Sequence, residues 1–467
     1  MAAWIRDFPL GKAPLVMIVL FLVSATPIGL RTTLASSSDT ELVFWVFAPP
    51  HYDEYEAKIP KFEAENPGVR VKLKKVFYEV LHDKLQSAFL SGYGAPDMVE
   101  IEFGQAGRFF KGRIQDIGFI DLKPLLERDG LREEFVEARL KFWSNRGRYY
   151  GLPHDLHPSV LMYQKHLFDE AGVDIDKIET WGDFVVEGRK LVKDKDGDGK
   201  TDQFAMMLGE RVWNFYWMLL QQRHAGMFDE AGNVTIDSDI AVDVLEKYCA
   251  LLNEGICAGN LGNDFTKSPN FAAYREGYFA AVIAPDWYIG FMKKHVPDMA
   301  GKWRARPLPI FEPGDATTAS LGGTMLGITK NCEHPKLAWK FAKYAYFDTE
   351  SLAKRFETTT ILPPVKSSWS HEIFSNPDPY FGGQVSGQLL IEQAEQLPDL
   401  FLSAYFPEAV EKFGDTIIAA LRGDKEPREA LEFLADHIRT IIDEDPFNAM
   451  TLGVEDQAET LESKTEK

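Results

Sequence analysis

Strand and helix patterns alternate over residues 41–102, and this order limits the fold more than any other feature of the chain. Two compact runs rich in strand formers, ELVFWVF and DMVEIE, flank two helical segments and the alternating strand VRVKLKKV. Strands separated by helices pair in parallel, because the helix returns the chain to the edge where the first strand began. The sequence therefore predicts an α/β fold whose ligand lies outside the carboxyl ends of its strands, near residues 48–51 and 100–105.

Three Gly- and Pro-rich segments interrupt the helical patterns further along the chain. They read YYGLPHDLHPS, RPLPIFEPG and TTILPPVKSS. Such segments do not continue a helix, because proline lacks the amide hydrogen and its ring clashes with the preceding turn. Three extended crossings predict two lobes, each built from discontinuous chain, and three unrelated surface loops are the alternative.

The first 35 residues are typical of a secretory signal peptide. A start that carries Arg6 and Lys12 precedes the uncharged run LVMIVLFLVSATPIGL, and small residues follow around Ala35. We predict export, removal of residues 1–35 and a mature protein in the periplasm. The apolar run is short for a membrane span, and an uncleaved N-terminal anchor is the alternative.

Charge and cysteine content exclude several classes of protein. The formal net charge of −20 argues against a nucleic-acid partner, which requires a basic surface. The three cysteines, Cys249, Cys257 and Cys332, are too few for a disulfide scaffold. An apolar helical stripe around Cys249 favours a buried thiol over a Cys249–Cys257 bridge. The tail, residues 446–467, is rich in Glu, Ser, Thr and Lys and is predicted to be disordered.

The stretch KDKDGDGKTDQFAM is typical of a calcium-binding loop. Ligand positions 1, 3, 5, 7 and 9 of such a loop, the fourth of which binds through a backbone carbonyl, fall on Asp194, Asp196, Asp198, Lys200 and Asp202. Position 12 requires a bidentate Glu, but here it is Ala205. The pattern is consistent with a structural calcium ion and equally with a hydrogen-bonded turn.

The order of motifs along residues 41–445 resembles that of bacterial extracellular solute-binding proteins of the maltodextrin-binding type, which serve ABC importers. The matching stretches include GAPDMVEIE, ETWGDFVVEGRKL, YREGYFAAVIAPDW and LGGTMLGITKNCEHPKLAWKFAKY. The resemblance implies a type II periplasmic-binding-protein fold, in which two α/β lobes close on a ligand by hinge motion. One lobe would comprise residues 41–153 and 308–360, and the other residues 154–307 and 361–445.

The resemblance also implies a function. The protein would be a monomer without catalytic activity that captures a mono- or oligosaccharide and delivers it to the permease subunits of the importer. It would need no cofactor beyond structural calcium. In this family a DGDGKxD loop commonly joins a helix and a strand of the second lobe, which argues against a calcium sensor.

Sugar recognition requires aromatic faces for stacking and planar polar groups for the hydroxyls. The resemblance places Trp287, in APDW, in the cleft, while Asp286 either binds hydroxyls or caps the following helix. The complete candidate site contains His51, Tyr52, Glu100, Glu102, Gln105, Asp155, His157, Trp213, Asp286, Trp287, Gly322 and Gly323. Core packing, bends and solvated strand ends are the structural alternatives for its members. Several polar cleft positions of the maltodextrin binders fall here on Pro49, Pro50, Ile101 and Gly104, which weakens the case for maltose.

Two other functions and one metal site are alternatives to sugar capture. Acidic residues in the predicted cleft would also suit a polyamine. An exported glycosidase would need a carboxyl pair such as Glu102 and Asp286. A metal cluster of His154, Asp155 and His157 does not follow a recognised ligand spacing.

The predicted signal peptide implies where the exported protein begins. Because small residues follow the apolar run, the exported protein is expected to begin near Ser36. Intact-mass measurement of the secreted protein checks the prediction, and a mature species that still begins at Met1 would contradict it.

Overall fold

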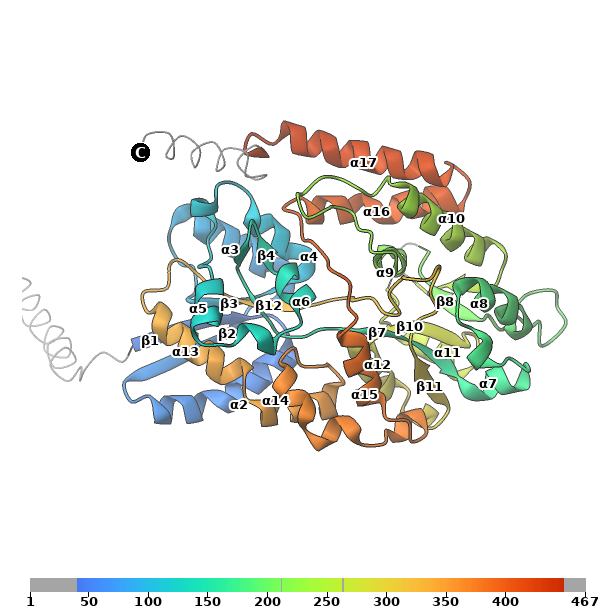
Figure 1. Ribbon diagram of the computed structural model, residues 1–467, viewed down its shortest axis with the longest axis horizontal. Coiled ribbons are helices and arrows are strands. Elements are labelled where there is room, and N and C mark those ends of the chain that lie inside the picture. Colours follow the sequence, from blue (N-terminus) through green and yellow to red (C-terminus); the bar gives the residue numbers. More distant parts are fainter. Residues whose placement is uncertain (1–39, 211, 263, 449–467) are drawn as a thin grey trace, which may run out of the picture.

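Two separate five-stranded sheets form the frame of the protein. The computed structural model describes residues 40–210, 212–262 and 264–448. The sheets lie side by side along the long axis of the molecule, and helices cover each of them (Figure 1). The predicted α/β architecture is confirmed, whereas the signal peptide and the tail beyond residue 448 lie outside the described residues. No helix in the described part of the chain is long and apolar enough to cross a membrane.

The first sheet has the strand order β2–β1–β3–β12–β6. Its strands are β1 (Thr40–Val46), β2 (Val69–Lys75), β3 (Met98–Glu102), β6 (Leu152–Pro153) and β12 (Thr324–Ile328). β1 pairs in parallel with β2 and β3, as the sequence predicts. β12 runs antiparallel to β3, with Thr324 opposite Glu102. The chain enters β12 at the carboxyl end of β3 and therefore runs against it.

The second sheet has the order β11–β7–β10–β8–β9. Its strands are β7 (Ser159–Gln164), β8 (Met206–Leu208), β9 (Cys257–Gly259), β10 (Ala281–Pro285) and β11 (Trp303–Arg306). β7 is antiparallel to both of its neighbours, whereas β8 is parallel to β9 and β10. A small hairpin pairs β4 (Ser144–Asn145) with β5 (Arg148–Tyr149).

The helices occupy most of the rest of the described chain. They are α2 (Pro49–Glu65), α3 (Tyr78–Ser91), α4 (Phe103–Ala106), α5 (Lys123–Arg128), α6 (Glu137–Phe142), α7 (Lys165–Glu170), α8 (Trp181–Gly188), α9 (Trp213–Gln222), α10 (Asp239–Asn253), α11 (Ser268–Arg275), α12 (Asp286–His295), α13 (Pro335–Tyr346), α14 (Thr349–Thr359), α15 (Ser386–Ala394), α16 (Phe406–Leu421) and α17 (Pro427–Glu444). Thr180 caps α8 in a capping box with Asp183, and Ser238 caps α10; threonine and serine are both favoured at this position.

The helix α2 begins earlier than its apolar spacing predicts. The sequence places residues 48–51 in a loop at the end of the first strand, but the helix starts at Pro49. Proline is favoured in the first turn of a helix, because its fixed φ suits the helix and its missing N–H would have no partner there. The early start buries His51 in the first turn, facing the first sheet.

The crossings between the two sheets lie against one another. Ser159 donates its backbone N–H to the carbonyl of Ala319, and Pro158 bridges Ser320. The segment 306–317 still packs on the side of the second sheet, where Trp181 donates its backbone N–H to the carbonyl of Ile310. The chain joins the first sheet at Thr324. The residue boundaries given above for the two lobes stay a prediction.

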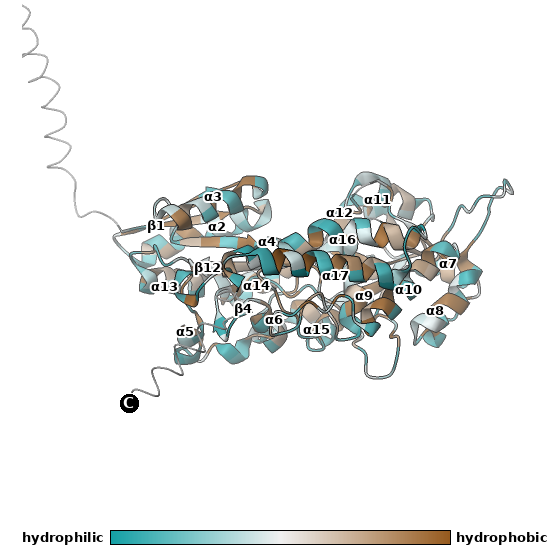
Figure 2. Ribbon diagram, turned by 90° about the horizontal axis from the view of Figure 1, so that it is seen from above, coloured by the Kyte–Doolittle hydropathy of each residue, from teal (hydrophilic) through white to brown (hydrophobic). Residues whose placement is uncertain are grey.

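The helices α16 and α17 lie across the top of the molecule (Figure 1). α16 contacts α9 and α10 beside the second sheet and also α4 at the end of the first sheet. Figure 2, which looks down on these helices, shows hydrophilic segments along α17, and its buried face includes Leu431, Leu434 and Ile438. One hydrophobic cluster is continuous from the first sheet into the second, and it includes Val99 and Val282.

All three cysteines are free and buried. Burial raises the pKa of the Cys249 thiol to about 11 and that of Cys332 to about 12, and it raises the pKa of Cys257 further. The buried-thiol interpretation of Cys249 is confirmed, and the alternative bridge to Cys257 is absent from the structure.

Candidate functional site

A buried carboxylate, Glu100, organises the end of the first sheet. Its oxygens accept hydrogen bonds from the hydroxyls of Tyr55 (2.6 Å) and Tyr346 (2.9 Å), and one oxygen lies 2.9 Å from Nδ1 of His51. Burial alone would raise the pKa of Glu100, but His51 and the hydrogen bonds outweigh burial and lower it. Glu100 therefore orients His51 and is itself enclosed by protein.

The first crossing contains a second buried carboxylate, Asp155, which is paired with Arg139 at 2.8 Å. Both side chains are 2% exposed. The arginine contacts Oδ1 of Asp155, while the other oxygen, Oδ2, lies 3.3 Å from Nδ1 of His154 and 3.2 Å from Nε2 of His157. These partners outweigh the effect of burial, so the pKa of Asp155 lies well below its usual range. The aspartate is ionised and fully engaged by protein.

The guanidinium of Arg139 holds two crossings together. It donates to the backbone carbonyls of Asp155 (2.9 Å) and Gly322 (3.0 Å). A Cβ atom on Gly323, whose φ is +141°, would lie 1.9 Å from Nη2 of the arginine. Glycine is therefore required at position 323, both for its φ and for the space that the arginine occupies.

The imidazole of His157 joins the first crossing to α12. Its Nδ1 lies 2.6 Å from Oδ1 of Asp286, while its Nε2 faces Asp155. Burial lowers the pKa of His157, but the two carboxylates outweigh it and raise the pKa to about 9. The histidine is therefore a cation held between two anions.

The carboxylate of Asp286 acts as a local clamp at the start of α12. Its Oδ1 also accepts the backbone N–H of Trp287 (2.6 Å), and its Oδ2 accepts that of Leu362 (2.7 Å) in the third crossing. The backbone carbonyl of Asp286 accepts the hydroxyl of Thr360 (2.8 Å). Asp286 is fully buried, so the structure gives it a positioning role.

The indole of Trp287 lies next to this clamp and is half-buried. Its Nε1 donates to the carbonyl of Leu321 (2.7 Å) in the second crossing. A Cβ on Gly322, whose φ is +104°, would lie 3.2 Å from this nitrogen and 3.1 Å from the ring of His157. Phe291, which is 39% exposed, packs edge-on against the indole at 5.5 Å between ring centroids. The indole is thus fixed through its N–H while part of its surface stays open.

A third group of candidate residues gathers where β3 ends. Glu102 accepts the N–H of Gly104 (2.8 Å) and the hydroxyl of Tyr78 (3.1 Å), which is also hydrogen-bonded to Gln105. Burial raises the pKa of Glu102 to about 7, so the carboxyl is protonated part of the time at neutral pH. Phe47, after β1, packs edge-on against Tyr78 at 5.5 Å. The sequence analysis missed Phe47 and Tyr78, although both follow strands at the edge that it selected.

The remaining candidates lie away from this chain of contacts. Tyr52 bonds to Glu56 on the exposed side of α2. Trp213 is half-buried on α9 and packs against Phe103 of α4 and Phe406 of α16. Trp217, one turn further along α9, faces the core and is 3% exposed.

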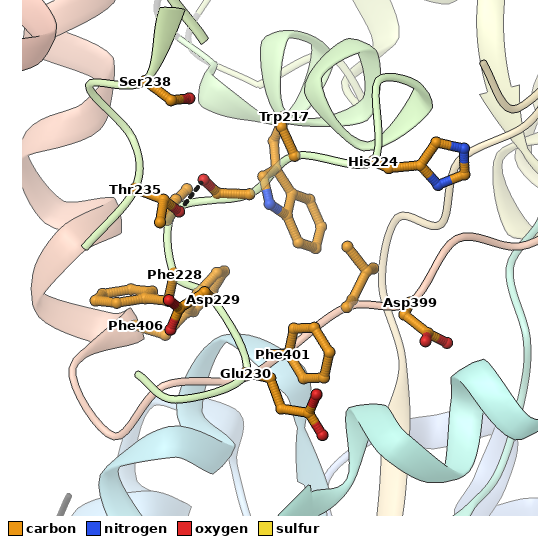
Figure 3. A pocket seen from close by; sticks show the side chains of 14 residues that line it. Trp217, His224, Phe228, Asp229, Glu230, Thr235, Ser238, Asp399, Phe401 and Phe406 are labelled. Carbon is orange, nitrogen blue, oxygen red and sulfur yellow. Dashed lines mark hydrogen bonds between the residues drawn. The ribbon is translucent and has the colours of Figure 1, made fainter. Parts of the chain in front are cut away.

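Trp217 and Phe406 also line a pocket of about 270 Å³. Figure 3 shows the indole of Trp217 projecting from α9 toward the segment that carries Asp399 and Phe401. Asp399 is paired with Lys141 of α6. Residues that precede the first crossing therefore reach the edge of this pocket. The remaining rings and carboxylates of the lining are His224, Phe228, Asp229 and Glu230. Rings and carboxylates together are suited to a polyhydroxylated ligand.

The histidines do not form a convincing metal centre. His51, Glu100 and His154 approach one another closely enough to share an ion. However, the rings of His51 and His154 are stacked, with centroids 3.7 Å apart and planes 27° apart, so their in-plane lone pairs do not converge on one point. Nε2 of His154 also lies 2.7 Å from the cationic Arg355. In the group of His154, Asp155 and His157, which the sequence analysis set aside as a metal site, both imidazoles face the same carboxylate oxygen of Asp155.

The calcium-like loop precedes a strand and not a second helix. β8 follows it at Met206. Carboxylate oxygens of Asp194, Asp196 and Asp202 lie within 4.8 Å of one another, which is consistent with a shared ion. The same carboxylates also fold the loop by themselves, because Asp194 accepts the N–H groups of Gly197 (2.7 Å) and Gly199 (2.9 Å).

The fold and these contacts define an extracellular solute-binding protein. Residues 48–350 match the family model of the bacterial extracellular solute-binding proteins, and the chain belongs to this family. The resemblance stated from the sequence is confirmed.

Two relatives have sequences that match most of the chain. An arabinooligosaccharide-binding protein of Halalkalibacterium halodurans is 31% identical over 384 residues, which cover 81% of this chain and 84% of the relative. A protein of the same name from Bacillus subtilis is 27% identical over 436 residues, or 91% of this chain and 98% of the relative.

The sugar-binding protein MalE from Xanthomonas citri has the same fold. Its structure is similar with a TM-score of 0.72 at 19% identity and covers 87% of this chain and 100% of that chain. The two-lobed type II periplasmic-binding-protein fold is therefore confirmed.

The open surface of Trp287 generates a prediction that separates stacking from core packing. Trp287→Ala should weaken ligand binding by about tenfold or more, because ring stacking contributes about 1 kcal/mol and desolvation of the ring adds to it. It should also lower stability, since the indole is half-buried and hydrogen-bonded. Titration calorimetry and denaturant midpoints measure the two effects.

Trp369 offers a matched control for this variant. It is also half-buried, and its indole donates to the carbonyl of Pro363 at 2.9 Å. Trp369→Ala should lower stability to a similar extent and leave affinity unchanged. Wild-type affinity in Trp287→Ala would remove Trp287 from the site.

The aspartate loop gives a prediction about calcium. If Asp194, Asp196 and Asp202 hold the ion, a chelator should lower the melting temperature, because binding to the folded state alone stabilises it. Ligand affinity should change little, and Asp194→Asn should abolish the effect of the chelator. No thermal shift, together with no bound metal by elemental analysis, would identify the loop as a turn only.

Proposed function

We propose that the protein captures an oligosaccharide outside the cytoplasm and delivers it to the permease subunits of an ABC importer. The observation that carries the proposal is the pairing of fixed aromatic rings with polar groups at the ends of both sheets. Trp287 and Phe291 follow β10, and Tyr78 and Glu102 lie at the ends of β2 and β3. The family and the periplasmic-binding-protein fold support the proposal.

Arabino-oligosaccharides are the ligands we propose first. The two relatives described above are arabinooligosaccharide-binding proteins and match 81% and 91% of the chain. Other proteins of this fold were solved with β-1,6-galactobiose and with mannotriose, at 21% identity each. Short oligosaccharides with open hydroxyl faces are therefore the class to test.

The partly protonated carboxyl of Glu102 favours a sugar over a polyamine. Burial raises the pKa of Glu102 to about 7, so at neutral pH this carboxyl carries less negative charge than an exposed glutamate. A carboxyl that is neutral part of the time can both donate to and accept from a hydroxyl. The charge at this position therefore suits a neutral ligand.

We propose that the protein binds its sugar without cleaving it. A glycosidase would need a second carboxyl group beside the sugar in addition to Glu102. Asp286, the predicted partner, is fully buried, and its oxygens accept hydrogen bonds from Trp287 and Leu362 and face His157. Its engagement in the clamp favours a structural role. We also propose that the protein is exported to the periplasm and acts there as a monomer.

A ligand screen tests the proposal. Thermal shifts of the mature protein would be measured with arabino-oligosaccharides, lactose, maltose and spermidine, and the hits confirmed by titration calorimetry. Arabino-oligosaccharides are expected to stabilise the protein by about 2.7 kcal/mol at 100 times their Kd, without release of reducing sugar. A shift with spermidine alone, or hydrolysis of the sugar, would contradict the proposal.

A further inference from the structure

Phe77 is an exposed aromatic residue at the carboxyl edge of the first sheet. It follows Val76, which donates its N–H to the carbonyl of Val46 and so extends the pairing of β2 with β1. Phe77 is 76% exposed, and it is the N-cap residue of α3. It therefore stands at the same edge as Phe47 and Glu102.

Both features of Phe77 are unfavourable for the folded protein alone. N-cap positions favour Ser, Thr, Asp and Asn, whose side chains accept a backbone N–H, and Phe77 provides no such bond. Exposure also forgoes the stabilisation that burial of a phenyl ring would supply. The folded protein therefore gains little from a phenyl ring at this position, which leaves the ring available to a ligand.

The neighbours of Phe77 indicate what that ligand contacts. The next residue, Tyr78, is 37% exposed and donates its hydroxyl to Glu102. Phe47, which packs against Tyr78, is half-buried. Exposure therefore increases from Phe47 through Tyr78 to Phe77, so the aromatic surface extends outward from the carboxyl group that the proposed function uses.

We propose that Phe77 is an outer stacking subsite that binds the sugar units of an oligosaccharide beyond those held near Glu102. The inference rests on the proposed function and adds a preference for longer chains. An aromatic face stacks on the apolar face of a sugar ring whatever the linkage, so the subsite selects for length.

The surroundings of Phe77 favour a carbohydrate over a protein partner. Val80, which is 52% exposed, adds to the apolar surface, but the charged side chains of Lys74, Lys75 and Glu79 are exposed among these residues. Protein interfaces present larger contiguous apolar patches. Leu90, which is 84% exposed, lies at the opposite end of α3, about 20 Å away along the helix. The two residues therefore do not form one docking face.

Titration of a length series tests the subsite. Mature wild-type protein and Phe77→Ala would be titrated with arabino-oligosaccharides of two to six units. Phe77→Ala should weaken binding of the chains of four or more units about fivefold to tenfold and leave the disaccharide within about twofold. Leu90→Ala, the matched control on the same helix, should bind every length as the wild type does.

A second variant separates ligand binding from folding. Phe77→Ser supplies a capping hydroxyl, so its denaturant midpoint should rise while its affinity for long chains falls. A lower midpoint would show that Phe77 is structural and would overturn the proposal.

The remaining outcomes distinguish the outer subsite at Phe77 from the proposed function of the whole protein. Wild-type binding of every chain length by Phe77→Ala overturns the outer subsite and leaves the proposed function intact. The same result with reduced sugar uptake in cells would assign Phe77 to a protein partner. A wild-type protein that binds no member of the series overturns both proposals.

Discussion

The buried ion pair between Arg139 and Asp155 is the interaction on which the junction of the two sheets depends. Both side chains are almost completely removed from water, and removal of one partner from such a pair typically costs about 3–5 kcal/mol. The guanidinium also donates to the backbone carbonyls of Asp155 and Gly322, in the first and second crossings, and to the hydroxyl of Ser320. The pair therefore fixes backbone and not only side chains, and it dictates glycine at position 323.

The position of the proposed sugar-stacking ring follows from this pair in a few contacts. Asp155 faces His157, His157 faces Asp286, and Asp286 holds the N–H of Trp287. Each contact joins groups of opposite charge or a charge to a backbone donor, and such bonds are stronger than neutral ones. A ring that is fixed before the ligand arrives loses little side-chain entropy on binding. Asp155 and Asp286 thus act mainly by positioning Trp287.

The sequence was sufficient for the parts of the fold that depend on local pattern. Alternation and strand formers predicted β1, β2 and β3, and Thr180 and Ser238 marked the starts of two helices. His51 and Glu102 were chosen as candidates because they follow or end predicted parallel strands, whose carboxyl ends can be found from the sequence. Asp286 was weighed equally as ligand group and as helix cap, and only its three-dimensional contacts show its buried position.

The residues that the sequence analysis missed act over long distances in the chain. Arg139 lies in a short helix whose pattern gives no sign of its role, and its partner Gly322 is 183 residues away. The antiparallel entry of β12 likewise follows from the path of a crossing and not from any local signal. Phe47 and Tyr78, in contrast, could have been found from the sequence. They also follow parallel strands, so the reasoning that chose Glu102 applied to them as well.

The burial of the three thiols has a consequence for how an exported protein of this kind matures. A thiol reacts with oxidants and disulfides through its thiolate, and burial both raises the pKa of each cysteine and shields its sulfur. In the folded chain the three cysteines are therefore inert in an oxidising compartment. Only the unfolded chain exposes them, so mispairing of the cysteines competes with folding itself. The yield of folded protein with three free thiols then depends on the rate of folding relative to the rate of thiol oxidation during export.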